Sequence, residues 1–134
     1  MDENGRFRSK GFTIIELMIA LTIVAIILAL AYPSYINYVR KSKRGDAQQA
    51  LMNWSVNQEI WRANHTSYAS TSDIAAPNLK HYNLSTSGTP NATTYTLQAV
   101  AQGDQAKDKA RDGTSCTTLT LNQAGQKTPA VCWD

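Results

Sequence analysis

The feature that most constrains this chain is an uninterrupted apolar run near its N-terminus. Residues 12–32 read FTIIELMIALTIVAIILALAY and contain one charged residue, Glu16. As an α-helix this run is about 31 Å long, and the hydrocarbon core of a bilayer is about 30 Å thick. The apolar part of a cleaved secretory signal peptide is shorter, with about 7–15 residues. We therefore predict a membrane anchor that is retained in the mature protein.

Helical periodicity continues beyond the apolar run. Pro33 removes one backbone donor and disfavours helical backbone at Tyr32, so we expect a kink or a break in the helix at this point. We predict one long helix over about 13–63, bent near Pro33, with an apolar first half and an amphipathic second half. Residues that recur at helical spacing in the second half are Ala47, Leu51, Trp54, Gln58 and Trp61.

The remaining residues alternate short β-type segments with turn-forming residues. A loop is expected over 64–78, where Ser, Thr, Asn, Ala and Pro dominate. We predict three or four antiparallel strands in a meander, with one face covered by Leu51, Trp54 and Trp61. The candidate strands are residues 81–86, 93–101, 116–121 and 131–133.

The two cysteines, Cys116 and Cys132, enclose 15 residues. A disulfide closing a loop of this size stabilises the folded state by about 3 kcal/mol in the chain-entropy treatment. Such a bond requires an oxidising compartment, which places the C-terminal domain outside the cytoplasm. The alternative is a pair of buried free thiols.

The composition leaves little material for catalysis. Thirteen Lys and Arg against ten Asp and Glu give a net charge of +3, which is only mildly basic. With two histidines, His65 and His81, and two cysteines, we expect no metal site and no cofactor. No common nucleophile, phosphate-loop or zinc-protease motif is present, so a self-contained enzyme is not expected.

The N-terminal residues resemble those of the type IV pilin family, with its class III signal peptide. Residues 10–18 read KGFTIIELM, in which a short basic leader ends at Gly11, Phe12 follows, and Glu16 is the fifth residue after the glycine. Further segments resemble the family at residues 31–35 (AYPSY) and 44–51 (RGDAQQAL), and residues 125–133 (GQKTPAVCW) resemble the C-terminus of one minor-pilin subgroup.

The resemblance implies an α+β fold, in which a long N-terminal helix packs on an antiparallel sheet of three or four strands. It implies that prepilin peptidase cuts between Gly11 and Phe12 and methylates the new amine of Phe12. The expected parts are a leader at 1–11, a membrane-spanning and filament-core helix at 12–39, and a globular domain at 40–134.

The resemblance also implies location and role. The leader is expected in the cytoplasm and the globular domain in the periplasm, with the chain in the bacterial inner membrane before it enters an extracellular fimbria. The expected partners are other pilin subunits, prepilin peptidase and the pilus assembly machinery. The expected role is that of a structural subunit, a minor pilin acting in assembly, adhesion, twitching motility or DNA uptake. The alternatives are a DNA-binding uptake receptor and a pseudopilin of type II secretion.

Glu16 requires a partner if it lies within a membrane. A carboxylate at the centre of a membrane helix costs roughly 2.5–3.5 kcal/mol on insertion scales. Cleavage before Phe12 creates a cationic amine, and the amine of a neighbouring subunit is expected to pair with Glu16 and to set the axial register of the filament. The alternative is a snorkelling or protonated Glu16 without a role.

Basic residues suggest a second kind of partner. Residues 40–44 (RKSKR) are interpreted as a solvated collar at the membrane surface, with DNA or anionic lipid as the alternative ligand. The stretch 107–112 is interpreted as a solvated loop. Tyr82 and Tyr95 are candidates for stacking on bases if they are exposed. The candidate contacts to DNA phosphates are Lys80, Lys107, Lys109, Arg111 and Lys127, with His81 as a possible addition.

Overall fold

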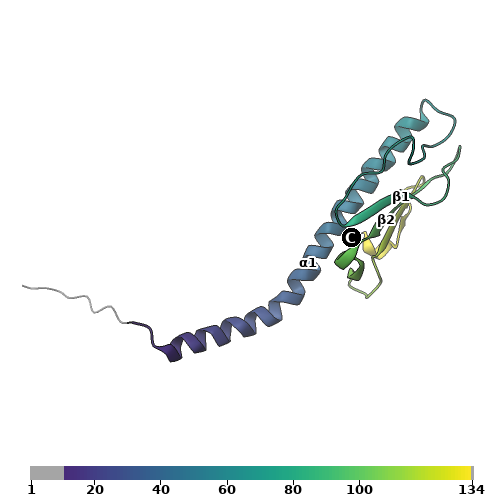
Figure 1. The fold of residues 1–134 in the computed structure, drawn as a ribbon. Helices are drawn as coiled ribbons and strands as arrows, with labels where there is room; N and C mark the ends of the chain where they lie inside the picture. Colours follow the sequence, from purple (N-terminus) through teal and green to yellow (C-terminus); the bar gives the residue numbers. More distant parts are fainter. Residues whose placement is uncertain (1–10, 134) are drawn as a thin grey trace, which may run out of the picture. The chain divides into compact units, whose positions relative to one another are not determined.

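The computed structural model describes residues 11–133 (Figure 1). Most of the predicted leader, residues 1–10, and the last residue, Asp134, lie outside the described part. One long helix precedes a four-stranded antiparallel sheet, which confirms the predicted fold class. The elements are α1 (Ile14–Arg62), β1 (Tyr82–Thr86), β2 (Thr96–Ala101), η1 (Gly103–Lys107), β3 (Thr118–Asn122), β4 (Lys127–Thr128) and η2 (Ala130–Cys132), where η denotes a 3-10 helix.

The chain divides into two units, Met1–Ile36 and Asn37–Asp134. The described part of the first unit is the apolar start of α1, and almost all of its side chains are exposed. Within the described residues, α1 is the helix whose length and composition suffice to cross a membrane. Apolar side chains exposed at this density require a nonaqueous environment or a protein partner.

The first turn of α1 is capped by its own sequence. The hydroxyl Oγ1 of Thr13 accepts a hydrogen bond from the backbone N–H of Glu16 at 3.2 Å. A threonine followed three residues later by glutamate is the pattern that satisfies the free N–H groups at a helix start. Glu16, which is predicted to set the axial register of the filament, therefore lies in the first turn of α1.

The helix continues through Pro33, which confirms the single long helix predicted over about 13–63; the chain is not interrupted at the proline. Proline lacks one N–H group and therefore removes a single backbone hydrogen bond. Strong helix formers precede Pro33, including Leu28, Leu30 and Ala31, and favour the helix up to this point. The loss of one bond is then too small to end the element.

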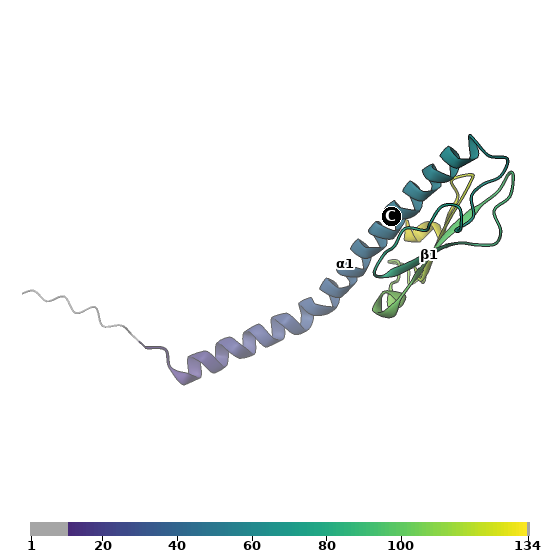
Figure 2. The same cartoon turned by 45° about the horizontal axis from the view of Figure 1, so that its top comes forward.

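In the second unit, one face of α1 packs against the sheet (Figures 1 and 2). The sheet has the strand order β1-β2-β3-β4 with antiparallel neighbours, which confirms the predicted meander. On β2 the buried residues alternate with partly exposed ones, as expected for a sheet covered on one face. The buried side chains of α1 recur every three or four residues and are Arg44, Ala47, Leu51, Trp54 and Gln58.

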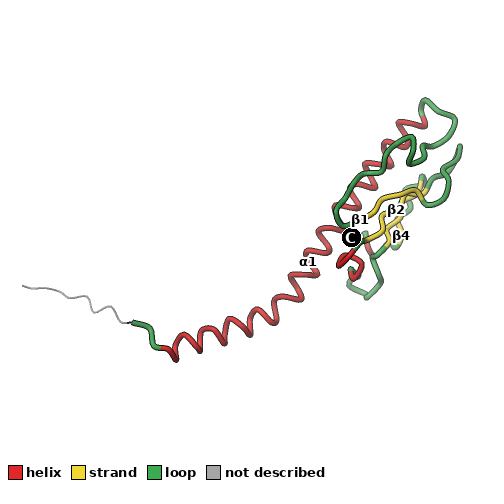
Figure 3. Tube along the Cα trace, in the orientation of Figure 1, coloured by secondary structure: helices red, strands yellow, loops and turns green. Residues whose placement is uncertain are grey.

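The prediction that Trp61 covers one face of the sheet is wrong. Trp61 is only partly buried, and its ring stacks on His65 with centroids 3.7 Å apart. Instead, the end of α1 is held to the following loop by Gln58, whose side-chain amide donates to the carbonyl of Ala69 and accepts from its N–H. Figure 3 shows this loop beside the second half of α1. The amide of Gln58 tolerates burial because both its nitrogen and its oxygen are hydrogen-bonded.

Two strands are shorter than predicted because side-chain and loop hydrogen bonds compete with the sheet. The side chain of Asn91 accepts from the backbone N–H groups of Thr93 and Thr94, so β2 begins at Thr96 rather than at residue 93. The N–H of Cys116 donates to the carbonyl of Asp108, so β3 begins at Thr118.

The last predicted strand is also wrong. Residues 130–132 form η2, and the fourth strand lies earlier, at Lys127–Thr128. Pro129 between them has no N–H to donate to a sheet partner, so the strand cannot extend past residue 128.

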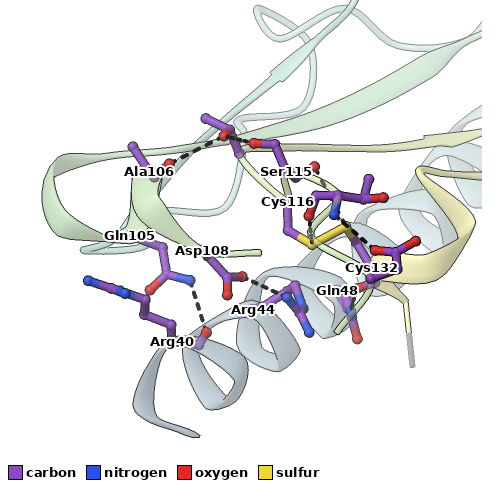
Figure 4. The surroundings of a disulfide bond; sticks show 12 residues. Arg40, Arg44, Gln48, Gln105, Ala106, Asp108, Ser115, Cys116 and Cys132 are labelled. Atoms are coloured by element: carbon purple, nitrogen blue, oxygen red, sulfur yellow. Dashed lines mark hydrogen bonds and ion pairs between the residues drawn. A yellow bond between two sulfur atoms is a disulfide. The ribbon is translucent and has the colours of Figure 1, made fainter. Parts of the chain in front are cut away.

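The predicted disulfide is confirmed. Cys116 and Cys132 are joined, and both are fully buried. The bond links the chain before β3 to η2 (Figure 4). The amide of Gln48 in α1 donates to the carbonyl of Cys132 at 2.6 Å, so the C-terminal segment is held to the helix as well as to the sheet.

We expect the Cys116→Ser, Cys132→Ser double variant to lose about 3 kcal/mol of its free energy of unfolding, because the unfolded chain regains the freedom of the enclosed loop. Denaturant unfolding of the full chain in detergent, followed by tryptophan fluorescence, measures the loss. Reductant should lower the stability of the unmodified chain by the same amount and leave the variant unchanged. Equal stability with and without reductant in the unmodified chain would contradict the prediction.

Candidate anion-binding site

Two arginines of α1 bind two aspartates of the segment around η1. Arg40 donates hydrogen bonds from Nε and Nη2 to the carboxylate of Asp104, and the shortest distance is 2.8 Å. Arg44 contacts Asp108 at 2.8 Å, and both side chains are almost completely buried. The arginines and the aspartates are each four residues apart, so the two pairs lie side by side along the helix. Figure 4 shows the second pair near the disulfide.

These pairs correct two predictions from the sequence. Residues 40–44 are not a wholly solvated collar, and residues 107–112 are not a wholly solvated loop, because Arg44 and Asp108 turn inward. The pKa of the Asp104 carboxyl lies below its usual value, first because Arg40 donates hydrogen bonds to it and then because Lys107 does. Asp104 is well exposed, so its pair adds little stability, whereas the buried pair has no water to replace a lost partner.

The ion pairs position a hollow of about 460 Å³ beside α1. Three exposed cations surround it, Lys41 from the helix and Lys109 and Arg111 from the loop before β3. Within residues 11–133 no ion pair engages these three side chains. The residues lining the hollow include no carboxylate and are Asn37, Tyr38, Lys41, Arg44, Lys109, Ala110, Arg111 and Val131.

The deepest cation of the hollow is incompletely paired. Arg44 is 4% exposed, and among the described residues its Nε has no hydrogen-bond partner while NH1 binds Asp108. Guanidinium and ammonium groups that converge without carboxylates are suited to an oxyanion such as a phosphate. The site is therefore suited to binding a phosphate group.

The five predicted DNA contacts are not brought together on one surface. Lys109 and Arg111 line the hollow, whereas Lys107 lies 3.3 Å from the Asp104 carboxylate. The ammonium of Lys127 lies 5.1 Å from the centroid of the Trp133 ring. Lys80 and His81 line a second hollow of about 200 Å³, together with Lys43, Asp46, Leu79 and Tyr82.

The two hollows lie on different sides of α1. Lys41 lines the first and Lys43 lines the second. Residues two positions apart in a helix point to nearly opposite sides, so one ligand of moderate size cannot contact both cations. Lys80 is therefore separated from Lys109 and Arg111, and sequence spacing alone contained no signal of this separation.

Tyr82 and Tyr95 do not meet the condition of exposure under which they were candidates for stacking. Tyr82 is 2% exposed and Tyr95 is 4% exposed, so neither ring is available to a base. Burial raises the pKa of both phenols, that of Tyr95 to about 12. The exposed aromatic side chain at the first hollow is Tyr38, which is 73% exposed and which the sequence analysis missed. Its one sequence signal is its place one helical turn before Lys41.

The processing residues lie in the first unit. Gly11 and Phe12 precede α1, and Phe12 is 77% exposed. In the uncut chain residue 12 has no free amine, so the predicted pairing of that amine with Glu16 stays a prediction. Among residues 11–133 there is no group of three or more His, Cys, Asp or Glu side chains placed to hold a metal ion.

Comparison with known proteins identifies the family. The model of the type IV minor pilin ComP, described as a DNA uptake sequence receptor, matches residues 33–120. This chain belongs to that family of type IV pilins. The model of the prokaryotic N-terminal methylation motif matches residues 6–32.

Individual pilins are similar over different parts of the chain. Fimbrial protein EcpC of Eikenella corrodens is 30% identical over 115 residues, covering 79% of this chain and 75% of that protein. The type IV major pilin PilE of Neisseria gonorrhoeae is 36% identical over 80 residues, covering 53% of this chain and 48% of that protein. A type IV pilin structure from Shewanella oneidensis has a TM-score of 0.57 at 26% identity, covering 71% of this chain and 98% of that one.

The minor pilin PilV of Neisseria meningitidis shares the fold, with a TM-score of 0.54 at 18% identity, covering 69% of this chain and 87% of that one. The chain is thus a type IV pilin-like subunit with a membrane-anchoring helix that later enters a pilus. The family and the methylation motif imply that its partners include other pilins and prepilin peptidase.

We expect Asp108→Asn to lose about 3–5 kcal/mol of the free energy of unfolding, because it leaves the buried Arg44 charge without its counterion. Denaturant unfolding of the full chain in detergent measures this loss. Replacing both partners, Arg44→Met with Asp108→Leu, should restore most of the stability. Asp104→Asn is the matched control, with a much smaller loss expected at this exposed position. A loss for Asp108→Asn no larger than that of the control would contradict the buried pair.

Proposed function

We propose that this pilin is a minor subunit cut between Gly11 and Phe12 and methylated at Phe12. The methylation motif over residues 6–32 and the exposure of Phe12 support this proposal. Residues 1–11 form the cytoplasmic leader, residues 12–39 the membrane and filament-core helix, and residues 40–134 the globular domain outside the cytoplasm. A buried disulfide supports that orientation, because it is maintained in an oxidising compartment.

In the filament, Glu16 pairs with the amine of Phe12 from a neighbouring subunit. Its carboxylate lies in an apolar segment, where an unpaired charge is unfavourable. Pairing with a cation at a defined height places each subunit at one axial position relative to the next. Pro33 leaves one carbonyl of α1 without its helical donor, which makes the backbone there easier to extend during packing.

Mass spectrometry of the N-terminal peptide tests the processing. We expect a chain beginning at methylated Phe12, present as a minor component of sheared surface filaments. A Gly11→Ala variant, which alters the residue before the cut, should retain its leader and stay in the membrane fraction. An unmodified N-terminus at Met1 in filaments from the unaltered chain would contradict the proposal, and dominance of the peptide in filaments would make the chain a major subunit.

The globular domain binds DNA, in the manner that the name of the matching family describes. The observation that carries this proposal is the set of exposed cations that no carboxylate of the described residues neutralises, Lys109 and Arg111 at the hollow and Lys127 beside Trp133. Cations of this kind bind backbone phosphates and release counterions. The partly exposed Trp133 ring adds an aromatic surface next to a cation.

Fluorescence anisotropy with labelled duplex DNA tests this proposal on the full chain in a nonionic detergent. We expect affinity to fall steeply with salt, and the double variant Lys109→Gln, Arg111→Gln to lower the salt slope by about one for each phosphate contact removed. Lys80→Gln is the matched control, because Lys80 lies at the other hollow. Equal slopes for the double variant and the control, or negligible binding at low salt, would refute DNA binding at this site.

A further inference from the structure

The cations of the first hollow lie at the end of the globular unit where α1 enters it. The hollow uses α1 residues Asn37 to Arg44, the first residues of this unit. The apolar run of the same helix ends at Tyr32. Lys41 is nine residues further along, which is at most about 14 Å of helix. Along the sequence of α1, the residues of the hollow therefore begin soon after the apolar run ends.

The short stretch of α1 between the apolar run and Lys41 allows this lysine to reach lipid headgroups. The headgroup layer adds roughly 5–7 Å to each side of the hydrocarbon core. At physiological salt the Debye length is about 8 Å, so Lys41 still experiences the charge of an anionic membrane surface. Its flexible side chain can also extend back toward the interface. Three exposed tyrosines mark the emerging helix, as aromatic residues do at membrane interfaces: Tyr32, Tyr35 and Tyr38, with exposed fractions of 66%, 63% and 73%.

We propose that, before assembly, the hollow lined by Lys41, Lys109 and Arg111 binds the phosphate of an anionic phospholipid headgroup. The lipid's phosphate occupies the concavity, whose lining residues include no carboxylate, and its acyl chains remain in the bilayer. This proposal rests on the membrane anchor and does not require DNA binding.

The buried Arg44 is part of the lining of the hollow. It binds Asp108, and among the described residues its Nε lacks a hydrogen-bond partner, so one N–H donor there is unsatisfied. The three outer cations come from α1 and from the loop after η1, and the two ion pairs fix that loop on the helix. The cations therefore converge before a ligand arrives, which lowers the entropic cost of binding.

Assembly would remove this ligand. A subunit that leaves the bilayer for a filament loses its lipid neighbours, so the same cations become available to other phosphates, including those of DNA. Lipid binding thus holds the globular unit at the membrane surface and keeps Lys109 and Arg111 occupied until the subunit is extracted.

Native mass spectrometry of the full chain in detergent tests the proposal with phosphatidylglycerol, phosphatidylcholine and inorganic phosphate as separate probes. We expect phosphatidylglycerol adducts that survive higher activation energy than phosphatidylcholine adducts and that millimolar inorganic phosphate does not displace. Lys41→Gln and Arg111→Gln should each weaken phosphatidylglycerol binding by about fivefold, the effect expected for one basic residue at an anionic surface. Lys80→Gln, at the other hollow, is the control.

The variants are chosen so that folding is not at issue. Lys41 and Arg111 are exposed and take part in no ion pair among residues 11–133, and unchanged denaturant unfolding verifies their fold. Equal binding of the two lipids, displacement by inorganic phosphate, or equal losses for Lys80→Gln would overturn the proposal. A chain that binds DNA but not phosphatidylglycerol refutes lipid binding alone, and the converse result refutes DNA binding alone.

Discussion

Every other feature of the globular unit depends on the burial of one face of α1 against the sheet. The face comprises the side chains that recur from Arg44 to Gln58, and they cover the buried side of β1, β2 and β3. A unit of this size has a small core, so the helix supplies a large part of it. The disulfide and the Gln58–Ala69 hydrogen bonds then hold the segments that the core does not reach.

The same helix serves two environments, and this requirement explains its composition. In the first unit it is apolar on all sides, because lipid or other helices surround it. In the second unit it is apolar on one side, and its polar side chains bind loops. The change occurs over residues 37–44, where cations and an exposed tyrosine replace aliphatic side chains. The phosphate site that we propose lies where the apolar part of the helix gives way to the part that packs on the sheet.

The buried pair of Arg44 and Asp108 is the least expected element of the site. Both residues occur in stretches that are rich in charge, and such stretches are usually solvated. Their burial determines where the loop carrying Lys109 and Arg111 lies, and therefore which cations converge. Local sequence carries no signal for this arrangement, because the partners are 64 residues apart. They meet only when the loop packs on the helix.

The sequence by itself determined the elements whose cause is local. The apolar run, the capped start at Thr13 and Glu16, the helical spacing up to Gln58, the meander and the cysteine pair all follow from short-range pattern or from composition. Only the tertiary structure decided the burial of Tyr82 and Tyr95, the separation of Lys80 from Lys109, and the inward turn of Arg44. The start of β2, by contrast, depends on a local contact, the turn that the side chain of Asn91 forms with Thr93 and Thr94. The physical reason is that burial and convergence are properties of surfaces formed by distant segments, and no pattern within one segment specifies them.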